Sequence, residues 1–215
     1  MTIETDERVR PTAVPPPASA SPGSLPEARC LNLPNLITVS RLVLAVILFG
    51  LIGMGGAALG LPVAALFLLA ATTDAVDGYV ARRYGQITTL GRVLDPFADK
   101  IIVCGTFVFL LERHPLSGVT AWMVVIVIGR EMFVTGLRSF LEQQGKDFSA
   151  TWSGKIKMIL QCAALTASLM SLDPHIGTPG FLLFRDVLLW SAVVATVFSG
   201  LVYVVRAGRL LQWQQ

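Results

Sequence analysis

Six long apolar segments follow one another along the chain, and this pattern limits the fold more than any other feature of the sequence. They cover about residues 37–54, 59–82, 94–111, 118–141, 152–172 and 181–206. About 20 helical residues cross a bilayer core of about 30 Å. Only 14% of the residues are charged and 53% are apolar, whereas about 25% of a soluble domain is charged. The sequence therefore predicts an all-α, polytopic membrane protein with six transmembrane helices.

The segment before the first apolar run has a different composition. Prolines, alanines and serines dominate positions 11–26. Such a stretch cannot bury enough apolar surface to offset the entropy lost on ordering. We therefore expect residues 1–29 to be a disordered tail and residues 30–215 to form the membrane domain. Residues 26–33 favour a short juxtamembrane element along the interface, and Asn35 is expected to cap the first span.

The distribution of cations predicts how the spans are oriented. Of the 17 Lys and Arg residues, Arg113 and Arg185 lie by the loops after the third and fifth spans. The other 15 lie in the N-terminal tail, at the opposite ends of the spans or after the sixth span. Because cytoplasmic loops carry the excess of Lys and Arg, we expect both termini and the loop between the second and third spans to be cytoplasmic.

Four aspartates lie where the second span ends and the third begins. Asp74 and Asp77 are three residues apart, Asp95 and Asp99 are four apart, and each spacing puts its pair on one helix face. A charge at the bilayer centre costs about 2.5–3.5 kcal/mol on insertion scales, so such carboxylates usually have a function. Two divalent cations would neutralise the four charges. Hard oxygen ligands favour Mg²⁺, with Mn²⁺ as the substitute.

The same segment contains residues suited to a phosphate-bearing ligand. Gly78, Ala81 and Arg82 fall on the side of the second span that carries its two aspartates. The two small residues leave room for a ligand against the backbone, and the guanidinium is a forked phosphate donor. In the third span, Pro96 is tolerated if the helix starts at or just before it, with Asp95 as its cap or first residue.

A basic cluster occurs on the same predicted side of the membrane. It comprises Arg130 and Arg138 at the end of the fourth span, and Lys155 and Lys157 at the start of the fifth. Such a cluster suits an anionic, phosphate-bearing substrate, although plain positive-inside anchoring is the alternative. Because intramembrane charges usually pair, Glu131 is expected to form a structural salt bridge with Arg130 or a helix neighbour. Aromatic residues near the span ends are expected to be interfacial anchors: Trp152, Trp190, Tyr203 and Trp213.

The aspartate segment resembles the complete signature of the CDP-alcohol phosphatidyltransferases. It reads Asp74-x₂-Asp77-Gly78-x₂-Ala81-Arg82-x₈-Gly91-x₃-Asp95-x₃-Asp99, with every position filled. The resemblance extends from about Asn32 to the C-terminus. Within the family, the chain is most similar to the bacterial branch that uses glycerol 3-phosphate. That similarity rests on less specific pieces: Asn32-Leu-Pro-Asn-Leu-Ile-Thr38 with Arg41, the residues around Asp95, the Arg130–Glu131 pair with Arg138, and Gly154-Lys155-x-Lys157.

The resemblance implies roles for these positions. Asp74, Asp77, Asp95 and Asp99 would hold the two metal ions, and Asp99 would also be the general base. The residues implied at the CDP-lipid are Asn35, Gly78, Ala81, Arg82, Thr88 and Gly91. The acceptor phosphate would be bound by Arg130, Arg138, Lys155 and Lys157. The substrates would be CDP-diacylglycerol and sn-glycerol 3-phosphate, and the products phosphatidylglycerol phosphate and CMP.

The resemblance also implies a setting for the enzyme. It indicates a multi-pass protein of the inner (cytoplasmic) membrane, with a homodimer as the expected assembly and no nucleic-acid partner. Other acceptors remain open, namely inositol phosphate, serine, or phosphatidylglycerol in cardiolipin synthesis, because they would use the same donor site. A divalent-cation transporter is the alternative from another class. It is disfavoured because the outer halves of the spans carry almost no ionisable residues.

Overall fold

The computed structural model describes residues 33–56, 59–84, 89–144 and 152–212, and the regular elements in these ranges are six α-helices. Side-chain surroundings are described for these ranges apart from residues 33–38, 73–99 and 210–212. The helices are α1 (Leu33–Met54), α2 (Gly60–Tyr84), α3 (Thr89–Leu111), α4 (Ala121–Gln143), α5 (Trp152–Met170) and α6 (Pro179–Gln212). The predicted tail (residues 1–29) and Thr88 lie outside the described residues.

The all-α prediction with six helices is confirmed for the described residues, but two predicted helix starts are wrong. Helix α1 begins at Leu33, so Asn35 lies in its first turn and is not its N-cap. Helix α3 begins at Thr89, seven residues before Pro96. Asp95 therefore neither starts nor caps this helix. Pro96 has no N–H group, so the carbonyl of Arg92 lacks the usual helical donor.

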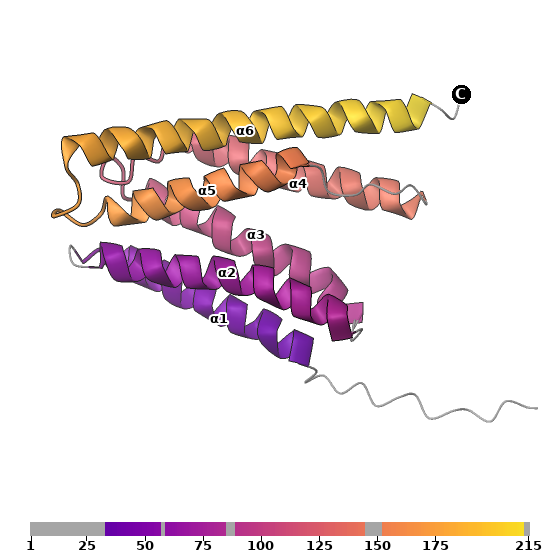
Figure 1. The fold of residues 1–215 in the computed structure, drawn as a ribbon, viewed down its shortest axis with the longest axis horizontal. Coiled ribbons are helices and arrows are strands. Elements are labelled where there is room, and N and C mark those ends of the chain that lie inside the picture. The colour runs from indigo at the N-terminus through magenta and orange to yellow at the C-terminus, as the bar shows by residue number, and fades with distance from the viewer. Residues whose placement is uncertain (1–32, 57–58, 85–88, 145–151, 213–215) are drawn as a thin grey trace, which may run out of the picture. The chain divides into compact units, whose positions relative to one another are not determined.

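Consecutive helices run in opposite directions, so the bundle has two chemically different ends (Figure 1). At one end lie the starts of α1, α3 and α5 and the ends of α2, α4 and α6. We call it the motif end, because the aspartate signature lies in the adjoining parts of α2 and α3. The other end contains the short connections α1–α2, α3–α4 and α5–α6, and we call it the turn end.

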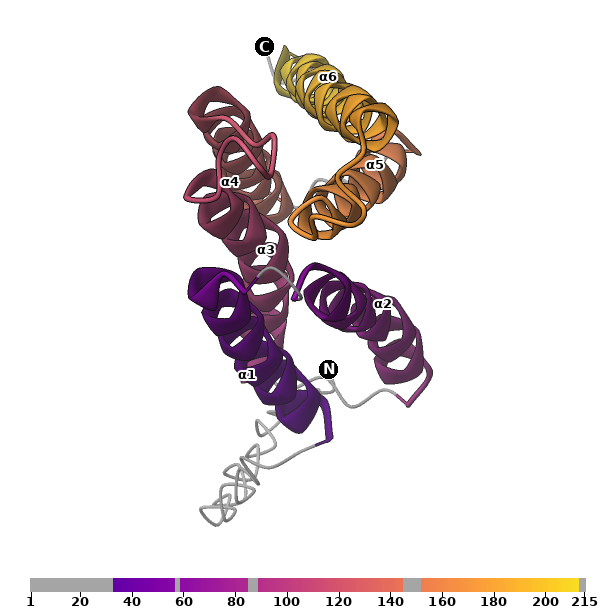
Figure 2. The same cartoon turned by 90° about the vertical axis from the view of Figure 1, so that its left-hand side faces the viewer.

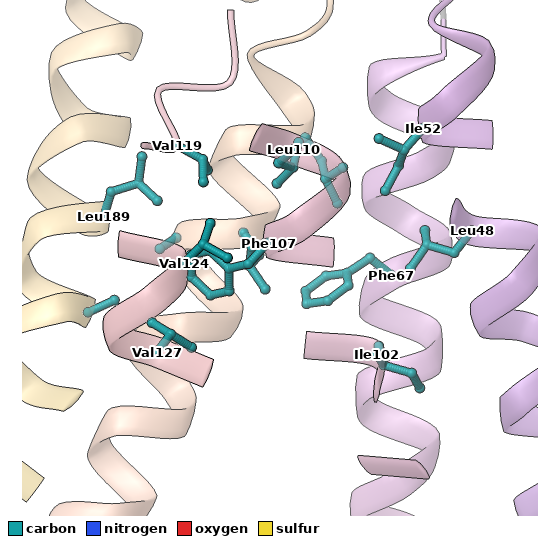
Figure 3. Packing of buried hydrophobic residues seen from close by; sticks show 14 of the residues in the cluster. Leu48, Ile52, Phe67, Ile102, Phe107, Leu110, Val119, Val124, Val127 and Leu189 are labelled. Atoms are coloured by element: carbon teal, nitrogen blue, oxygen red, sulfur yellow. The ribbon is translucent and has the colours of Figure 1, made fainter. Parts of the chain in front are cut away.

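Helix α3 contacts four others, namely α1, α2, α4 and α5. Figure 2, viewed from the turn end, shows α3 between these neighbours, while α6 packs on α4 and α5. Fully buried apolar side chains fill the centre, among them Phe67 of α2 and Phe107 and Leu110 of α3 (Figure 3). Gly105 allows α1 to approach α3 closely, because a Cβ atom there would overlap the Phe49 ring.

Two arginines hold the turn end together. Arg113, just after α3, donates from Nε and Nη2 to the Ile52 carbonyl of α1 at 3.1 and 2.9 Å. Arg185 of α6 donates from Nη1 to the Leu116 carbonyl at 2.5 Å and pairs with Asp186 at 2.7 Å. Ser171 also donates to the Leu116 carbonyl, at 2.9 Å. Arg113 and Arg185 are the two cations that the sequence assigns to this side of the bundle. Both hydrogen-bond to carbonyls of other helices or loops and so stabilise the turn end.

Among the described residues, one helix is long and apolar enough to cross a membrane, the Pro179–Arg209 part of α6. Shorter apolar stretches cover Val39–Met54 in α1, Gly60–Thr72 in α2 and Lys100–Leu111 in α3. In α2 and α3 these stretches end at residues 72 and 100, where the description of the side chains also ends. Six membrane crossings therefore stay a prediction. Large exposed apolar side chains are present on several helices, as expected of lipid-facing surfaces, for example Val46 of α1 and Leu201 of α6.

Candidate active site

The aspartates of the signature lie at matching depths in two contacting helices. Asp74 lies ten residues before the end of α2, and Asp99 lies ten residues after the start of α3. Asp77 lies seven residues before the same helix end, and Asp95 six residues after the same start. Four residues join the two antiparallel helices, which contact each other. All four carboxylate-bearing positions therefore fall within about three helical turns of one connection.

This placement fits a site for divalent cations. Two pairs of carboxylates at matching depths supply the hard oxygen donors that Mg²⁺ and Mn²⁺ prefer. Their side chains lie outside the part of the chain for which side chains are described. Elsewhere, where side chains are described, no three His, Cys, Asp or Glu residues come together as a metal-binding group. The signature is the candidate metal centre because it places four aspartate positions near one connection, and ligation by its individual residues stays a prediction.

The other residues predicted at the CDP-lipid lie at the motif end. Gly78, Ala81 and Arg82 occupy the last two turns of α2, and Gly91 occupies the first turn of α3. Asn35 lies in the first turn of α1, which contacts both helices. The structure thus brings these positions to one end of the bundle, with Thr88 in the connection outside the described residues.

Glu131 of α4 joins two cations of the basic cluster. Its Oε1 atom lies 3.1 Å from Nη1 of Arg130, its neighbour in sequence. The same oxygen accepts a hydrogen bond from Nζ of Lys157, which comes from α5. The three side chains are about nine-tenths buried, with exposed fractions of 11% for Arg130, 10% for Glu131 and 8% for Lys157. The predicted salt bridge of Glu131 is confirmed, and it also links α4 to α5.

Helix α6 provides further described contacts of Arg130. Nη2 of Arg130 donates to Oγ of Ser199 at 2.6 Å, and the guanidinium carbon lies 5.4 Å from the centre of the Tyr203 ring. Gly200 lies against the side-chain stem, because a Cβ atom there would be 3.3 Å from Cγ of Arg130. Tyr203 is 3% exposed, so its prediction as an interfacial anchor is wrong. Its ring is buried against a cation.

This cluster lies beside the helix that carries Asp95 and Asp99. Helix α3 contacts both helices that carry the cluster, α4 and α5. The basic cluster therefore lies on helices that pack against the helix carrying these two aspartates.

The other two predicted acceptor residues do not join the described ion pairs of Glu131. Lys155 is exposed, and its Nζ lies 4.9 Å from the centre of the Trp152 ring. Arg138 is half-buried, two turns beyond Arg130 on α4, and its buried Nε has no hydrogen-bond partner in the described structure. The structure thus brings Arg130 and Lys157 together and places Arg138 and Lys155 closer to the helix termini.

Residues 31–198 match the model of the CDP-alcohol phosphatidyltransferase family. The chain therefore belongs to this family, and the protein is an enzyme, a transferase. It is 39% identical to the CDP-diacylglycerol–glycerol-3-phosphate 3-phosphatidyltransferase of Bacillus subtilis, over 80% of this chain and 93% of that protein. It is 34% identical to the probable phosphatidylglycerophosphate synthase of Mycobacterium tuberculosis, over 85% of this chain and 84% of the relative. A Rickettsia typhi protein with the first of these names is 30% identical, over 80% and 94% of the two chains.

Sequence reasoning missed the α6 residues around Arg130. Ser199 and Gly200 lie in a mainly apolar run, and Tyr203 follows Ser199 at the i+4 position on the same helix face. This small polar face was the available signal. The sequence did not reveal that it packs on α4, since that depends on contacts between distant parts of the chain.

Proposed function

We propose that the enzyme transfers the phosphatidyl group of CDP-diacylglycerol to sn-glycerol 3-phosphate, forming phosphatidylglycerol phosphate and CMP. The observation that carries this proposal is the buried pair of cations, Arg130 and Lys157, on two helices that contact the helix holding Asp99. Two cations share one carboxylate, so one positive charge is left for a substrate anion. The names of the relatives support the same donor and acceptor.

Donor binding is assigned to the motif end of the bundle. Gly78 and Ala81 leave room for the CDP group, and Arg82 pairs with its phosphates. Asn35, Thr88 and Gly91 complete the donor contacts. Asp74, Asp77, Asp95 and Asp99 hold two divalent cations, Mg²⁺ by preference and Mn²⁺ as the substitute. These cations, when bound, would neutralise phosphate charge and make the β-phosphorus more electrophilic.

The chemical step needs one proton acceptor and a fixed alcohol. Asp99 removes the proton of the acceptor hydroxyl as its oxygen forms a bond to the β-phosphorus of the donor. The bond from that phosphorus to the oxygen of the CMP phosphate breaks, and CMP leaves with the electron pair. Arg130, Arg138, Lys155 and Lys157 hold the acceptor phosphate, so that its hydroxyl is positioned for attack.

The same proposal includes six membrane crossings in the inner membrane, with the motif end and both termini on the cytoplasmic side. The acyl chains of the donor then stay in the lipid, while the water-soluble acceptor enters from the cytoplasm. The basic residues of the motif end support this orientation by the positive-inside rule. A homodimer is proposed from the family resemblance alone.

An acceptor assay tests this function. The purified full-length protein is supplied with CDP-diacylglycerol and Mg²⁺ in lipid vesicles, together with one labelled acceptor at a time. We expect lipid product and an equal amount of CMP with glycerol 3-phosphate, and loss of both on chelation of the metal. Product from inositol phosphate, serine or phosphatidylglycerol, with none from glycerol 3-phosphate, would show that the acceptor is wrong.

A further inference from the structure

Arg130 is held by residues of α4 and α6, and the part contributed by α6 has no role in the function proposed above. We propose that α6 is a positioning element of the acceptor-phosphate site. Ser199, Gly200 and Tyr203 fix the guanidinium of Arg130, and Glu131 fixes the distance between that guanidinium and Lys157. This inference rests on the proposed function, because it requires Arg130 to bind the acceptor phosphate.

The described hydrogen bonds use two of the three guanidinium nitrogens of Arg130. Nη1 donates to Glu131 at 3.1 Å, and Nη2 donates to Ser199 at 2.6 Å. The Tyr203 ring contacts the guanidinium through a cation–π interaction. The Nε–H group is buried and has no hydrogen-bond partner in the described structure. A buried donor without a partner is costly, and an oxygen of a substrate phosphate is a suitable acceptor for it.

The charges around Glu131 support positioning over simple neutralisation. Arg130 and Lys157 contact the same oxygen atom, Oε1, although they come from different helices. Without this carboxylate, two cations at this spacing would repel each other in a poorly hydrated interior. Glu131 therefore keeps them as neighbours, and Ser199 determines how the guanidinium is turned relative to Lys157.

A second polar contact of α6 involves no residue of the proposed site and therefore serves as a comparison for the Ser199 contact. Nε2 of Gln161 on α5 donates to Oγ1 of Thr196 at 2.9 Å, and both residues are fully buried. Thr196 precedes Ser199 by three residues, so both hydroxyls serve contacts of α6 with its neighbours. Of these two hydroxyls, that of Ser199 accepts a hydrogen bond from a proposed substrate-binding cation, and that of Thr196 accepts one from an amide. Thr196 is therefore a matched control.

The experiment compares Ser199→Ala with Thr196→Ala in the full-length protein in vesicles. KM is measured separately for glycerol 3-phosphate and for CDP-diacylglycerol, and thermal unfolding is measured for both variants. We expect Ser199→Ala to raise KM for glycerol 3-phosphate about tenfold, because a hydrogen bond to a charged group is lost. KM for CDP-diacylglycerol should change less than twofold. Thr196→Ala should lower the unfolding temperature and leave both KM values unchanged.

Two further comparisons separate positioning from packing. Tyr203→Leu should raise KM for glycerol 3-phosphate more than Tyr203→Phe, because phenylalanine keeps the aromatic face. In an Arg130→Ala background, Ser199→Ala should have no further effect on that KM, because its effect acts through Arg130. If Ser199→Ala does not yield folded protein, the Tyr203 pair provides the same test.

The inference is overturned if Ser199→Ala changes both KM values equally or neither, or if its effect persists without Arg130. Such a result leaves the proposed function intact, provided that the wild type uses glycerol 3-phosphate. If the wild type uses only a phosphate-free acceptor, both proposals fail. If it uses another phosphate-bearing acceptor, the proposed acceptor is wrong, and the same KM comparison with that compound decides the inference.

Discussion

The carboxylate of Glu131 accepts from two cations of different helices in a region that is about nine-tenths buried. Removing one partner of a buried ion pair usually destabilises a protein by about 3–5 kcal/mol, because the other charge remains without compensation. If Glu131 were removed, Arg130 and Lys157 would in addition repel each other. The side chain thus has a structural role and, in the proposed reaction, determines how much positive charge reaches the acceptor.

Asp99 is the residue on which the chemical step depends. Asp99→Asn should lower turnover by at least about 100-fold, because the amide cannot accept the proton of the acceptor hydroxyl. Binding of CDP-diacylglycerol should remain measurable, since the amide oxygen keeps its place and the other three aspartates are unchanged. Initial rates and binding of labelled CDP-diacylglycerol check the two parts separately.

Asp173→Asn is the control for this variant, because Asp173 lies at the turn end, where its Oδ1 accepts from the backbone N–H of His175. This change should leave turnover within about twofold of the wild type, since the residue is remote from the proposed chemistry. Wild-type activity in Asp99→Asn would remove that residue from the role of general base.

At the residue scale, contacts between residues close in sequence could be predicted, and contacts between residues far apart in sequence could not. The aspartates could be predicted as a group because their spacing places them on adjoining helix segments. The ion pair of Arg130 with Glu131 could also be predicted, since the two are neighbours in sequence. The contacts of Arg130 with Ser199 and Tyr203 could not, because 69 residues separate Arg130 from Ser199. Tyr203 was misread because an aromatic residue near a span end resembles an anchor.

The helices themselves could be predicted because each apolar segment is long and its connections contain glycine or proline. The starts of α1 and α3 could not be predicted, since proline and asparagine were interpreted as start signals. In both helices the backbone is already helical before these residues. The tertiary contacts of α1 and α3 with their neighbours outweigh a local signal of this kind.

The connection after α1 provides a test of the turn end. Gly55 has φ of +67°, and a Cβ atom there would overlap the guanidinium of Arg113. Gly55→Ala should therefore destabilise the protein by about 1–2 kcal/mol from backbone strain alone. Thermal unfolding in vesicles measures this change, and the KM values should stay unchanged because the connection lies far from the motif end.

The matched control for this variant is Gly50→Ala in α1, where no atom lies within 4 Å of the added Cβ. That change should raise stability by about 0.5–1 kcal/mol, since alanine is the better helix former. If both alanine variants changed stability in the same direction, the proposed strain at Gly55 would be wrong.

For the whole molecule, the two ends of the bundle are proposed to face opposite sides of the membrane. His114 at the turn end and Glu142 near the motif end are both exposed. In a variant with Cys30, Cys104 and Cys162 replaced by alanine, one new cysteine is introduced at either position. His114→Cys should react with an impermeant maleimide on intact cells, and Glu142→Cys only after lysis. Reaction from the same side at both positions would contradict the six-span orientation.

The length of α6 has a consequence for the depth of its last turns. Its 34 residues span about 51 Å at 1.5 Å per residue, whereas the hydrocarbon core is about 30 Å thick. In the proposed orientation, the excess carries Arg206 and Arg209 beyond the acyl chains to the level of the lipid headgroups. Phosphates of anionic lipids attract arginines there. The helix that positions Arg130 inside the bundle would then also be anchored to the headgroups of the inner leaflet.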